Sequence, residues 1–199
     1  YKSIIEKSIK EPHRSLFLGL QNQVNNDGLT GLFNHRYLYE KLEEEIKSML
    51  RSDAPLSIIL LDIDYFKKIN DQHGHTVGDE ALKGIRATIK GSIRSTDIAG
   101  RYGGEEFMVI LPDTNLEDTY QVAEKIRTGI EEEVYCTKNI KITISAGIAQ
   151  FAENINKAEV HDYLKLVNSF VNVADGNLYQ AKASGRNLTV GGNIAVEDK

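Results

Sequence analysis

The chain has 199 residues, of which 41% are hydrophobic and 27% are charged, a composition typical of one folded domain rather than a disordered chain. Its formal net charge of −5 does not suggest a nucleic-acid partner, and it shows neither a bilayer-length apolar run nor a signal-peptide pattern. The single cysteine, Cys136, excludes an internal disulfide and favours a reducing compartment, so we expect a cytoplasmic domain without direct membrane contact.

Residues 1–26 are predicted to be the end of a helical connector. Apolar residues such as Ile5 and Ile9 recur there at helical spacing, and Pro12 starts or interrupts a helix. The chain begins with Tyr1 rather than Met, so we expect it to be a piece of a longer protein. Two interpretations stay open: a segment that packs on the following domain, or a linker helix that carries a signal from an upstream sensor.

From position 27 onward the pattern mixes helices and strands. Apolar residues at a 3.6-residue period predict helices over Asn34–Leu50, Gly78–Arg94, Asn115–Glu132 and Val160–Ser184. Short apolar or alternating runs predict strands over Ser57–Ile63, Asp97–Tyr102, Glu105–Leu111, Ile140–Phe151 and Leu188–Val190. This order predicts an α+β layer fold with one central sheet.

Two acids, Asp62 and Asp64, stand at the end of the predicted buried strand Ser57–Ile63. Side chains two residues apart in an extended segment lie on the same side. An acid at the end of a buried strand is costly unless it is paired or binds a cation, and Mg²⁺ prefers carboxylate oxygens. The alternative is that Asp64 caps a helix and Asp62 is an ordinary strand-end residue.

A short helix is expected to begin directly after Asp64. Its free backbone N–H groups, at Tyr65, Phe66 and Lys67, would form a site for an anion such as phosphate. The Lys67 ammonium adds a point charge suited to the same ligand. The alternative is that Lys67 is an ordinary solvated lysine.

The polar stretch that follows is predicted to be a loop between helices. Asn70 and Asp79 are residue types that read a guanine edge, because the carboxylate accepts from the ring N–H and the exocyclic amine, which adenine lacks. The alternative for Asp79 is the N-cap of the helix Gly78–Arg94. His73 and His75 have the spacing of a metal pair, but no third ligand follows at zinc spacing, so we interpret them as structural.

The most informative run is Arg-Tyr-Gly-Gly-Glu-Glu-Phe at positions 101–107. Two glycines between two alternating stretches predict a two-residue hairpin turn, since such turns need a positive φ that glycine adopts at no steric cost. Glu105 and Glu106 follow at once and, as strand neighbours, are expected to point to opposite faces. Asp62 and Glu105 would form a magnesium pair if their strands are neighbours.

This run closely resembles the signature of the GGDEF family, in its Gly-Gly-Glu-Glu-Phe form, whose members are diguanylate cyclases. Further blocks resemble the family in family order, at Asp27–Arg36, Asp62–Asp79, Ser145–Gly147 and Ala174–Asn187. The resemblance implies a palm-like nucleotidyl cyclase fold, with a central, mostly antiparallel sheet flanked by helices. We therefore expect an N-terminal linker over 1–26, the cyclase domain over 27–190 and a C-terminal tail over 191–199.

The resemblance also implies a metal and catalytic centre. Asp62, the backbone carbonyl of Ile63 and Glu105 would hold Mg²⁺, for which Mn²⁺ is a possible substitute. Asp62, Glu105 and Glu106 would be the catalytic side chains. Whether Glu105 or Glu106 acts as general base, and how many metal ions bind, stay open.

The remaining roles implied by the resemblance concern GTP. The triphosphate would be held by backbone amides near Tyr65 and Phe66 with Lys67, and by Lys182 and Arg186 one turn apart at the end of the last helix. Asn70 and Asp79 would bind guanine, and Gly103 and Gly104 would lie close to the nucleotide.

Arg94 and Asp97, just upstream of the hairpin, match the family's inhibitory Arg-x-x-Asp site for cyclic di-GMP. A guanidinium can donate two bonds to the O6/N7 edge of guanine, and a carboxylate can accept from its N–H groups. The alternative is a helix-terminal arginine that pairs locally with an aspartate.

The resemblance therefore implies a magnesium-dependent diguanylate cyclase that joins two GTP molecules across a homodimer and is inhibited by its product. A domain that only binds cyclic di-GMP as a receptor is the alternative, and a purely structural dimerisation module is a third possibility.

Overall fold

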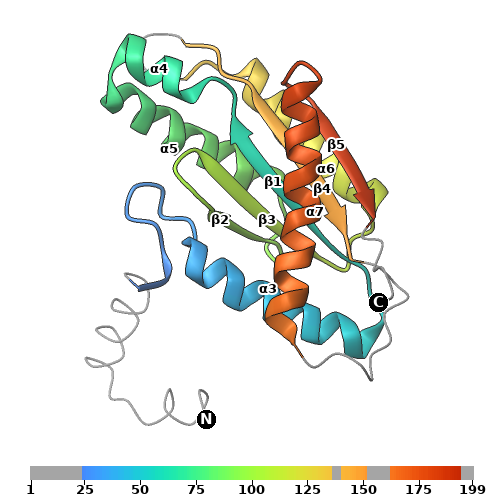
Figure 1. The fold of residues 1–199 in the computed structure, drawn as a ribbon. Coiled ribbons are helices and arrows are strands. Elements are labelled where there is room, and N and C mark those ends of the chain that lie inside the picture. Colours follow the sequence, from blue (N-terminus) through green and yellow to red (C-terminus); the bar gives the residue numbers. More distant parts are fainter. Residues whose placement is uncertain (1–23, 136–139, 152–161, 194–199) are drawn as a thin grey trace, which may run out of the picture.

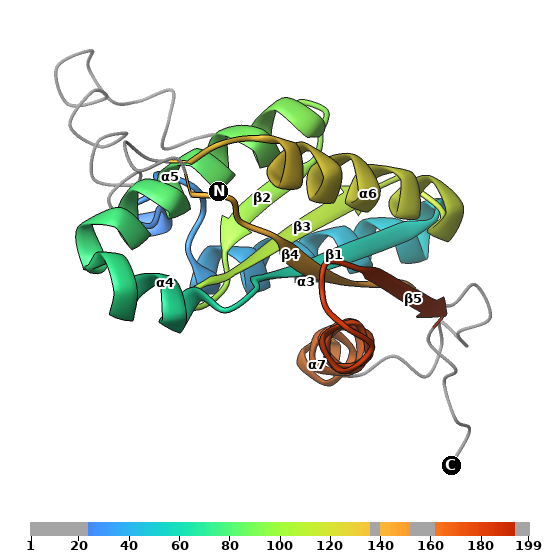
Figure 2. The same cartoon turned by 90° about the horizontal axis from the view of Figure 1, so that it is seen from above.

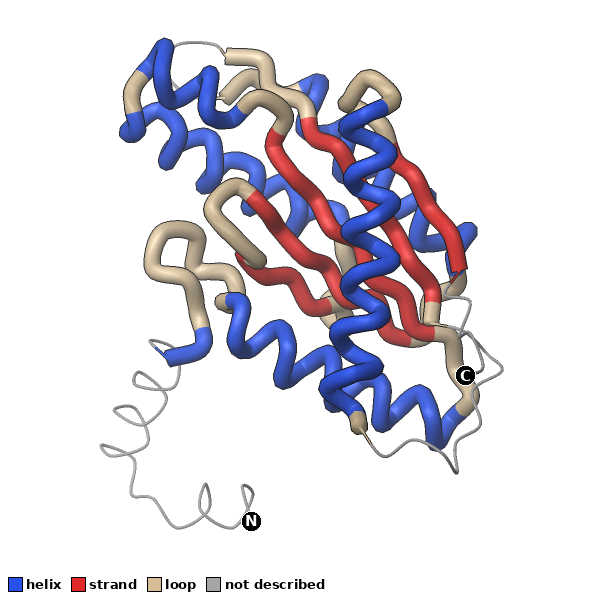
Figure 3. The backbone as a smooth tube through the Cα atoms, in the orientation of Figure 1, coloured by secondary structure: helices blue, strands red, loops and turns tan. Residues whose placement is uncertain are grey.

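The computed structural model describes residues 24–135, 140–151 and 162–193, so residues 1–23 of the connector predicted over 1–26 lie outside them. Figures 1 and 3 show a sheet flanked by helices on both faces. The helices are α3 (His35–Ser52), α4 (Phe66–His73), α5 (His75–Ser92), α6 (Leu116–Glu132) and α7 (Tyr163–Ala183). The strands are β1 (Leu56–Ile63), β2 (Ile98–Arg101), β3 (Glu106–Pro112), β4 (Ile144–Gln150) and β5 (Thr189–Asn193).

The sheet has the strand order β2-β3-β1-β4-β5, and only the β4–β5 pair is parallel. The predicted α+β fold with a mostly antiparallel sheet is therefore confirmed. Strand β1 lies in the middle and all eight of its residues are buried, as its continuous apolar run predicts. None of the described helices combines the length and apolar character needed to span a bilayer.

The alternation of side chains along β1 separates two hydrophobic layers. Ile59, Leu61 and Ile63 pack in a cluster with the apolar stripes of α5 and α6, whereas Ile58 and Leu60 pack with those of α3 and α7. Figure 2 shows the two helix layers on opposite sides of the sheet. By this period of two, the side chain of Asp62 belongs to the α7 side.

Helix α7 lies unusually close to β4 because position 147 has no side chain. A Cβ atom on Gly147 would collide with the backbone carbonyl of Ala174 and the backbone amide of Leu178, both in α7. The contact brings the C-terminal half of α7 close to the sheet, on the same face as the side chain of Asp62.

The β2–β3 hairpin differs from the predicted two-residue glycine turn. Strand β3 begins at Glu106, and the closing bonds run from the N–H groups of Tyr102 and Gly103 to the Glu106 carbonyl. Neither Gly103 nor Gly104 has a positive φ. The prediction was wrong because the turn is longer, and Gly103 is needed for space beside the Glu106 carboxylate rather than for a left-handed backbone.

Helix α5 begins at His75, three residues before its predicted start, with Gly74 at the N-cap position. Asp79 is therefore the fifth residue of the helix, and its interpretation as an N-cap is wrong. Gly74 separates α4 from α5 with a φ of 86°, a backbone conformation that glycine adopts readily.

Removing the close approach at position 147 should destabilise the whole domain. We expect Gly147→Ala to lower the free energy of unfolding by roughly 1–3 kcal/mol or more, because backbone atoms of α7 cannot move aside as a side chain can. Urea unfolding monitored by circular dichroism measures the change. Gly176→Ala in exposed, open space on α7 is the matched control and should gain about 0.5–1 kcal/mol. A neutral Gly147→Ala would contradict this account.

Candidate functional site

Two acidic residues face each other across the central strands. Asp62, near the end of β1, is the register partner of Glu106, the first residue of β3. Directly opposite residues of an antiparallel pair have their side chains on the same face. Asp62 is only 7% exposed, so its carboxylate lies largely out of water.

Glu105 lies next to this pair, in the hairpin loop. The N–H of Ile63 donates a hydrogen bond of 3.3 Å to the Glu105 carbonyl, which joins the end of β1 to the loop. The Glu106 carboxylate reaches back to the space beside Gly103, where a Cβ atom would collide with it, whereas Gly104 faces open space. Gly103 thus leaves room for the Glu106 carboxylate, and Gly104 leaves open space at the tip of the hairpin.

All three carboxyl groups are harder to ionise than usual. Burial raises the pKa of Glu105 and of Glu106, and the charge of Asp62 raises both further. Burial also raises the pKa of Asp62, although the Lys182 ammonium acts in the opposite direction. Acids that are kept together under such repulsion are typical of sites that bind a cation or move a proton.

Carboxylates of this kind could hold a divalent cation such as Mg²⁺. Mg²⁺ is usually bound through one or two carboxylates plus substrate phosphates, rather than by a complete cage of protein ligands. In the described part of the chain, no three Asp, Glu, His or Cys side chains form a ready-made metal cluster. The Asp62 and Glu105 carboxylates and the Ile63 carbonyl are therefore suited to an ion whose other ligands come with the substrate.

Two basic residues come to the same place from the end of α7. Lys182 Nζ lies 2.7 Å from Asp62 Oδ2, and the Arg186 guanidinium lies 4.5 Å from the ring centroid of Tyr65. Arg186 follows the helix rather than lying within it, because α7 ends at Ala183 and the N–H of Arg186 donates to the carbonyl of Ala181. The expected position of Arg186 one helical turn after Lys182 is corrected accordingly.

Helix α4 begins next to the carboxylates, with Tyr65 at its N-cap in a left-handed conformation (φ 56°). No side chain caps the helix there, so the N–H groups at its start are not bonded by a cap. Lys67 is exposed in the first turn. The interpretation of Asp64 as the N-cap is wrong, because its carboxylate accepts hydrogen bonds from Thr143, Ser145 and Asn187 instead.

The two predicted guanine-binding residues lie on neighbouring helices. Asn70 is in α4, and its side-chain Oδ1 is buried and unpaired among the described residues. It packs against Gly78 of α5, where a Cβ atom would collide with it. Asp79, the next residue, is exposed. A buried oxygen without a partner is uncommon and calls for a reason such as a ligand.

Arg94 and Asp97 contact each other through the backbone. The Asp97 carboxylate accepts a hydrogen bond of 2.7 Å from the Arg94 N–H, and Arg94 is exposed. Across the described residues, its guanidinium forms no ion pair. The alternative of a local salt bridge between the Arg94 guanidinium and Asp97 is therefore wrong for the described residues. The guanidinium is available to a ligand.

Sequence reasoning assigned no role to Arg101, which holds the hairpin tip. Its guanidinium donates to the Gly104 carbonyl at 2.6 and 3.1 Å and lies 3.3 Å from the Asp27 carboxylate. Burial acts to raise the pKa of Asp27, but hydrogen bonds from Thr30 and the charge of Arg101 lower it overall. Arg101 and Asp27 are 74 positions apart, so no local spacing links them.

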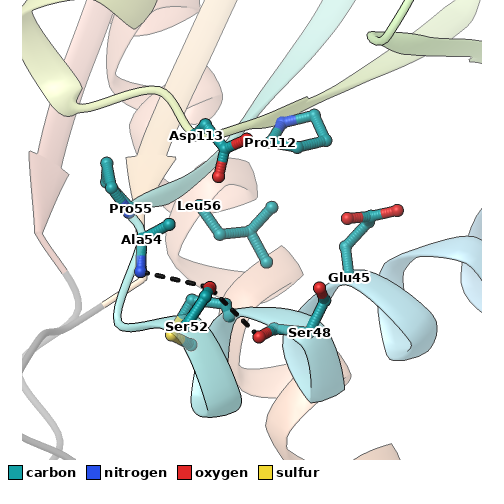
Figure 4. A pocket seen from close by; sticks show the side chains of 9 residues that line it. Glu45, Ser48, Ser52, Ala54, Pro55, Leu56, Pro112 and Asp113 are labelled. Atoms are coloured by element: carbon teal, nitrogen blue, oxygen red, sulfur yellow. Dashed lines mark hydrogen bonds between the residues drawn. The ribbon is translucent and has the colours of Figure 1, made fainter.

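A separate pocket lies at the other end of the central strands (Figure 4). Its lining includes Leu56 and Pro112, which are register partners six residues from the Asp62–Glu106 pair. At about 3.3 Å per residue, the pocket is ~20 Å from the carboxylates. It also contains Glu45, whose pKa is raised by burial, but it does not belong to the carboxylate site.

The comparisons with known proteins agree on one family. The family model described as "Diguanylate cyclase, GGDEF domain" matches residues 24–188. The response regulator PleD of Caulobacter vibrioides is 40% identical over 169 residues, which cover 83% of this chain and 35% of PleD. The chain thus spans between 35% and 46% of the length of the first curated relatives it matches.

Solved structures show the same fold. The diguanylate cyclase SiaD from Pseudomonas aeruginosa, in complex with its activator SiaC, has a TM-score of 0.77 and 32% identity, covering 96% of this chain and 70% of SiaD. The GGDEF domain of DgcB from Caulobacter crescentus, in complex with c-di-GMP, has a TM-score of 0.74 and 28% identity, covering 84% and 95% of the two chains. The expected cyclase fold is therefore confirmed.

The burial of Glu106, together with its repulsion by the neighbouring carboxylates, should appear as a pH-dependent cost in stability. A raised pKa in the folded state means that ionised Glu106 destabilises the fold above that pKa, and that the cost disappears below its usual pKa of 4.5. We expect Glu106→Gln to raise the melting temperature near pH 7, with the gain vanishing as the pH approaches 4. Thermal unfolding across this pH range measures it.

Glu117→Gln, in the exposed first turn of α6, is the matched control. It should slightly destabilise the domain, because it removes a charge that favours a helix N-terminus. A gain at Glu106 that is equally large at pH 4 and pH 7 would show that the ionisation of Glu106 is not its cause.

Proposed function

The chain belongs to the GGDEF family of diguanylate cyclase domains, and from that premise we propose that it condenses two GTP molecules into cyclic di-GMP and two pyrophosphates. The observation that supports this most is the meeting of Asp62, Glu105 and Glu106 at one end of the sheet, beside Lys182 and Arg186. Such a site offers ligands for a divalent cation and positive charges for phosphates together. GTP is a cytoplasmic nucleotide, so we place the reaction in the cytoplasm.

The metal in this proposal is Mg²⁺, with Mn²⁺ as a substitute. Asp62, Glu105 and the Ile63 carbonyl would hold it, and Glu106 would support the site from the opposite strand. When bound, the ion would polarise the phosphoryl oxygen and lower the pKa of the attacking hydroxyl. The ion pair between Asp62 and Lys182 leaves the lysine next to the place where phosphates would arrive.

The triphosphate would lie between two groups of donors. On one side are the uncapped N–H groups at Tyr65 and Phe66, with Lys67 in the same turn. On the other side are Lys182 and Arg186. Gly104 would let the nucleotide approach the backbone, since nothing lies within 4 Å of where its side chain would be, and Gly103 would lie beside the nucleotide next to the Glu106 carboxylate.

The guanine base would be recognised by one side chain from α4 and one from α5. Asn70 contributes an amide whose buried oxygen lacks a partner among the described residues, and Asp79 contributes an exposed carboxylate. A carboxylate accepts from guanine but would be left unpaired by adenine, so this pair favours GTP over ATP.

In the proposed reaction, the 3′-hydroxyl oxygen of one GTP attacks the α-phosphorus of the other. The bond from that phosphorus to the oxygen bridging to the β-phosphate breaks, and pyrophosphate leaves. The hydroxyl proton passes to a carboxylate of the Glu105–Glu106 pair. Each chain supplies one half-site, so a homodimer is required, and a second transfer closes the ring.

The product would also bind at Arg94 and Asp97 and inhibit the enzyme. The exposed guanidinium can donate to the O6/N7 edge of guanine. The DgcB structure, solved with c-di-GMP, supports a place for this ligand on the fold. A domain that only binds cyclic di-GMP would keep this site without turnover.

Incubating the protein with GTP and Mg²⁺ tests the proposal directly. We expect mass spectrometry to detect cyclic di-GMP, at a specific activity that rises with protein concentration because a dimer is required. Glu105→Gln should lower the rate about a hundredfold or more, since it removes a charged metal ligand, while leaving binding of cyclic di-GMP intact. A verified dimer that binds cyclic di-GMP but forms none would establish the receptor instead.

Arg94→Ala should relieve product inhibition without raising the initial rate. Losing a bidentate contact with guanine should raise the inhibitory concentration of cyclic di-GMP about tenfold or more. Initial rates at increasing cyclic di-GMP measure the change, and Arg51→Ala, at the exposed end of α3, is the control. Unchanged inhibition in Arg94→Ala would remove this arginine from the product site.

A further inference from the structure

Asp64 is a buried carboxylate that the proposed chemistry does not use. It is 4% exposed and follows directly after β1. Its Oδ1 accepts a hydrogen bond of 2.7 Å from the Ser145 hydroxyl. Its Oδ2 accepts from the Thr143 hydroxyl at 2.7 Å and from the backbone N–H of Asn187 at 3.0 Å. Both oxygens are therefore engaged by neutral donors of the protein.

These bonds distinguish Asp64 from Asp62, two residues earlier. Asp62 is paired with an ammonium and lies opposite Glu106, so it belongs to the charged side of the site. Asp64 joins three segments: the end of β1, the start of β4 with the residue before it, and the turn after α7. A carboxylate with this set of donors acts as a structural clamp rather than as a metal ligand.

The turn that Asp64 holds carries Arg186. Three successive residues there have positive φ: Gly185 at 119°, Arg186 at 66° and Asn187 at 46°. For residues other than glycine such conformations are costly and persist only where the surroundings hold them. The bond from the Asn187 N–H to Asp64 is one such support, and it lies immediately next to Arg186.

The side chain of Asn187 supplies a second support, on the α6 side. Its Oδ1 accepts from Arg127 at 2.8 Å, and its Nδ2 donates to Glu131 at 2.8 Å. Arg127 is in turn bound by Glu124. The turn is thus fixed between the end of β1 and the surface of α6.

A further contact to Arg186 comes from Tyr65, the residue directly after Asp64. Tyr65 has a φ of 56°, and its ring lies 4.5 Å from the Arg186 guanidinium, with its hydroxyl 3.4 Å from Nη1. Asp64 therefore supports Arg186 in two ways. Its carboxylate holds the turn that carries Arg186, and the ring that contacts the guanidinium belongs to Tyr65, the next residue in the chain.

We propose that Asp64 is a positioning residue for the triphosphate, which acts by holding the Gly185–Asn187 turn so that Arg186 points at the outer phosphates of GTP. This inference rests on the proposed function, in which Arg186 binds those phosphates. It predicts that Asp64 contributes to the recognition of the phosphate tail without contacting the nucleotide.

Binding measurements can separate this role from a general loss of structure. The ligands are guanosine 5′-(α,β-methylene)triphosphate, which cannot release pyrophosphate, and GMP, which lacks outer phosphates; both are titrated with Mg²⁺ by calorimetry. We expect Asp64→Asn to weaken the triphosphate about tenfold to a hundredfold and GMP by less than twofold. Asp118→Asn, an exposed aspartate of α6, is the matched control and should change neither affinity.

The double variant with Arg186→Ala tests whether Asp64 acts through the arginine. If it does, adding Asp64→Asn to Arg186→Ala should produce no further loss of triphosphate affinity. Additive losses, or an equal loss for GMP, would overturn the inference. So would full triphosphate affinity in Asp64→Asn while Arg186→Ala is impaired, a result that would leave the proposed function standing.

An unimpaired Arg186→Ala would overturn both the phosphate role of Arg186 and the role inferred for Asp64, whereas the turnover assay would still test the enzyme by itself. Should Asp64→Asn fail to fold, Thr143→Val and Ser145→Ala each remove one donor from the clamp. Each should weaken the triphosphate selectively and less severely, and unchanged affinity in both variants would count against the clamp.

Discussion

The buried carboxylate of Asp62 at the end of the central strand is the constraint around which the site is organised. A charge that lies largely out of water needs a partner of opposite sign, and a second acid directly across the sheet makes that need greater. The Lys182 ammonium supplies part of the positive charge that Asp62 needs. The fold therefore keeps an unfavourable group of acids at a place where a cation and a phosphate chain would together balance the charge.

Helix α7 supplies the positive charge, and its placement depends on two glycines. Gly147 lets the helix lie against β4, which puts Lys182 within reach of Asp62. Gly185, with a φ of 119°, then ends the helix through a bond from the Arg186 N–H to the Ala181 carbonyl. Neither glycine needs to touch a ligand, yet each determines where a cationic side chain lies.

The sequence predicted the strands and most of the helices well, because hydrophobic period is a local signal. The sequence-based predictions were wrong or incomplete where the role of a residue depends on contacts in three dimensions. The glycines of the hairpin were assigned to a left-handed turn, but Gly103 is small because the Glu106 carboxylate occupies the space beside it. The contact of Arg101 with Asp27 joins positions far apart in the chain, so no periodicity could have revealed it.

The two aspartates at the end of β1 show why a motif alone cannot assign roles. In a continuing strand, Asp62 and Asp64 would present equivalent carboxylates to one face. The chain instead leaves the strand at Ile63, and Tyr65 adopts a left-handed conformation. Asp64 thereby meets the hydroxyls of Thr143 and Ser145, whereas Asp62 meets an ammonium. Neutral donors hold Asp64 within the turn, whereas a single ammonium holds Asp62, so of these two acids Asp62 is the one whose partner a metal ion could replace without breaking the hydrogen bonds of the turn.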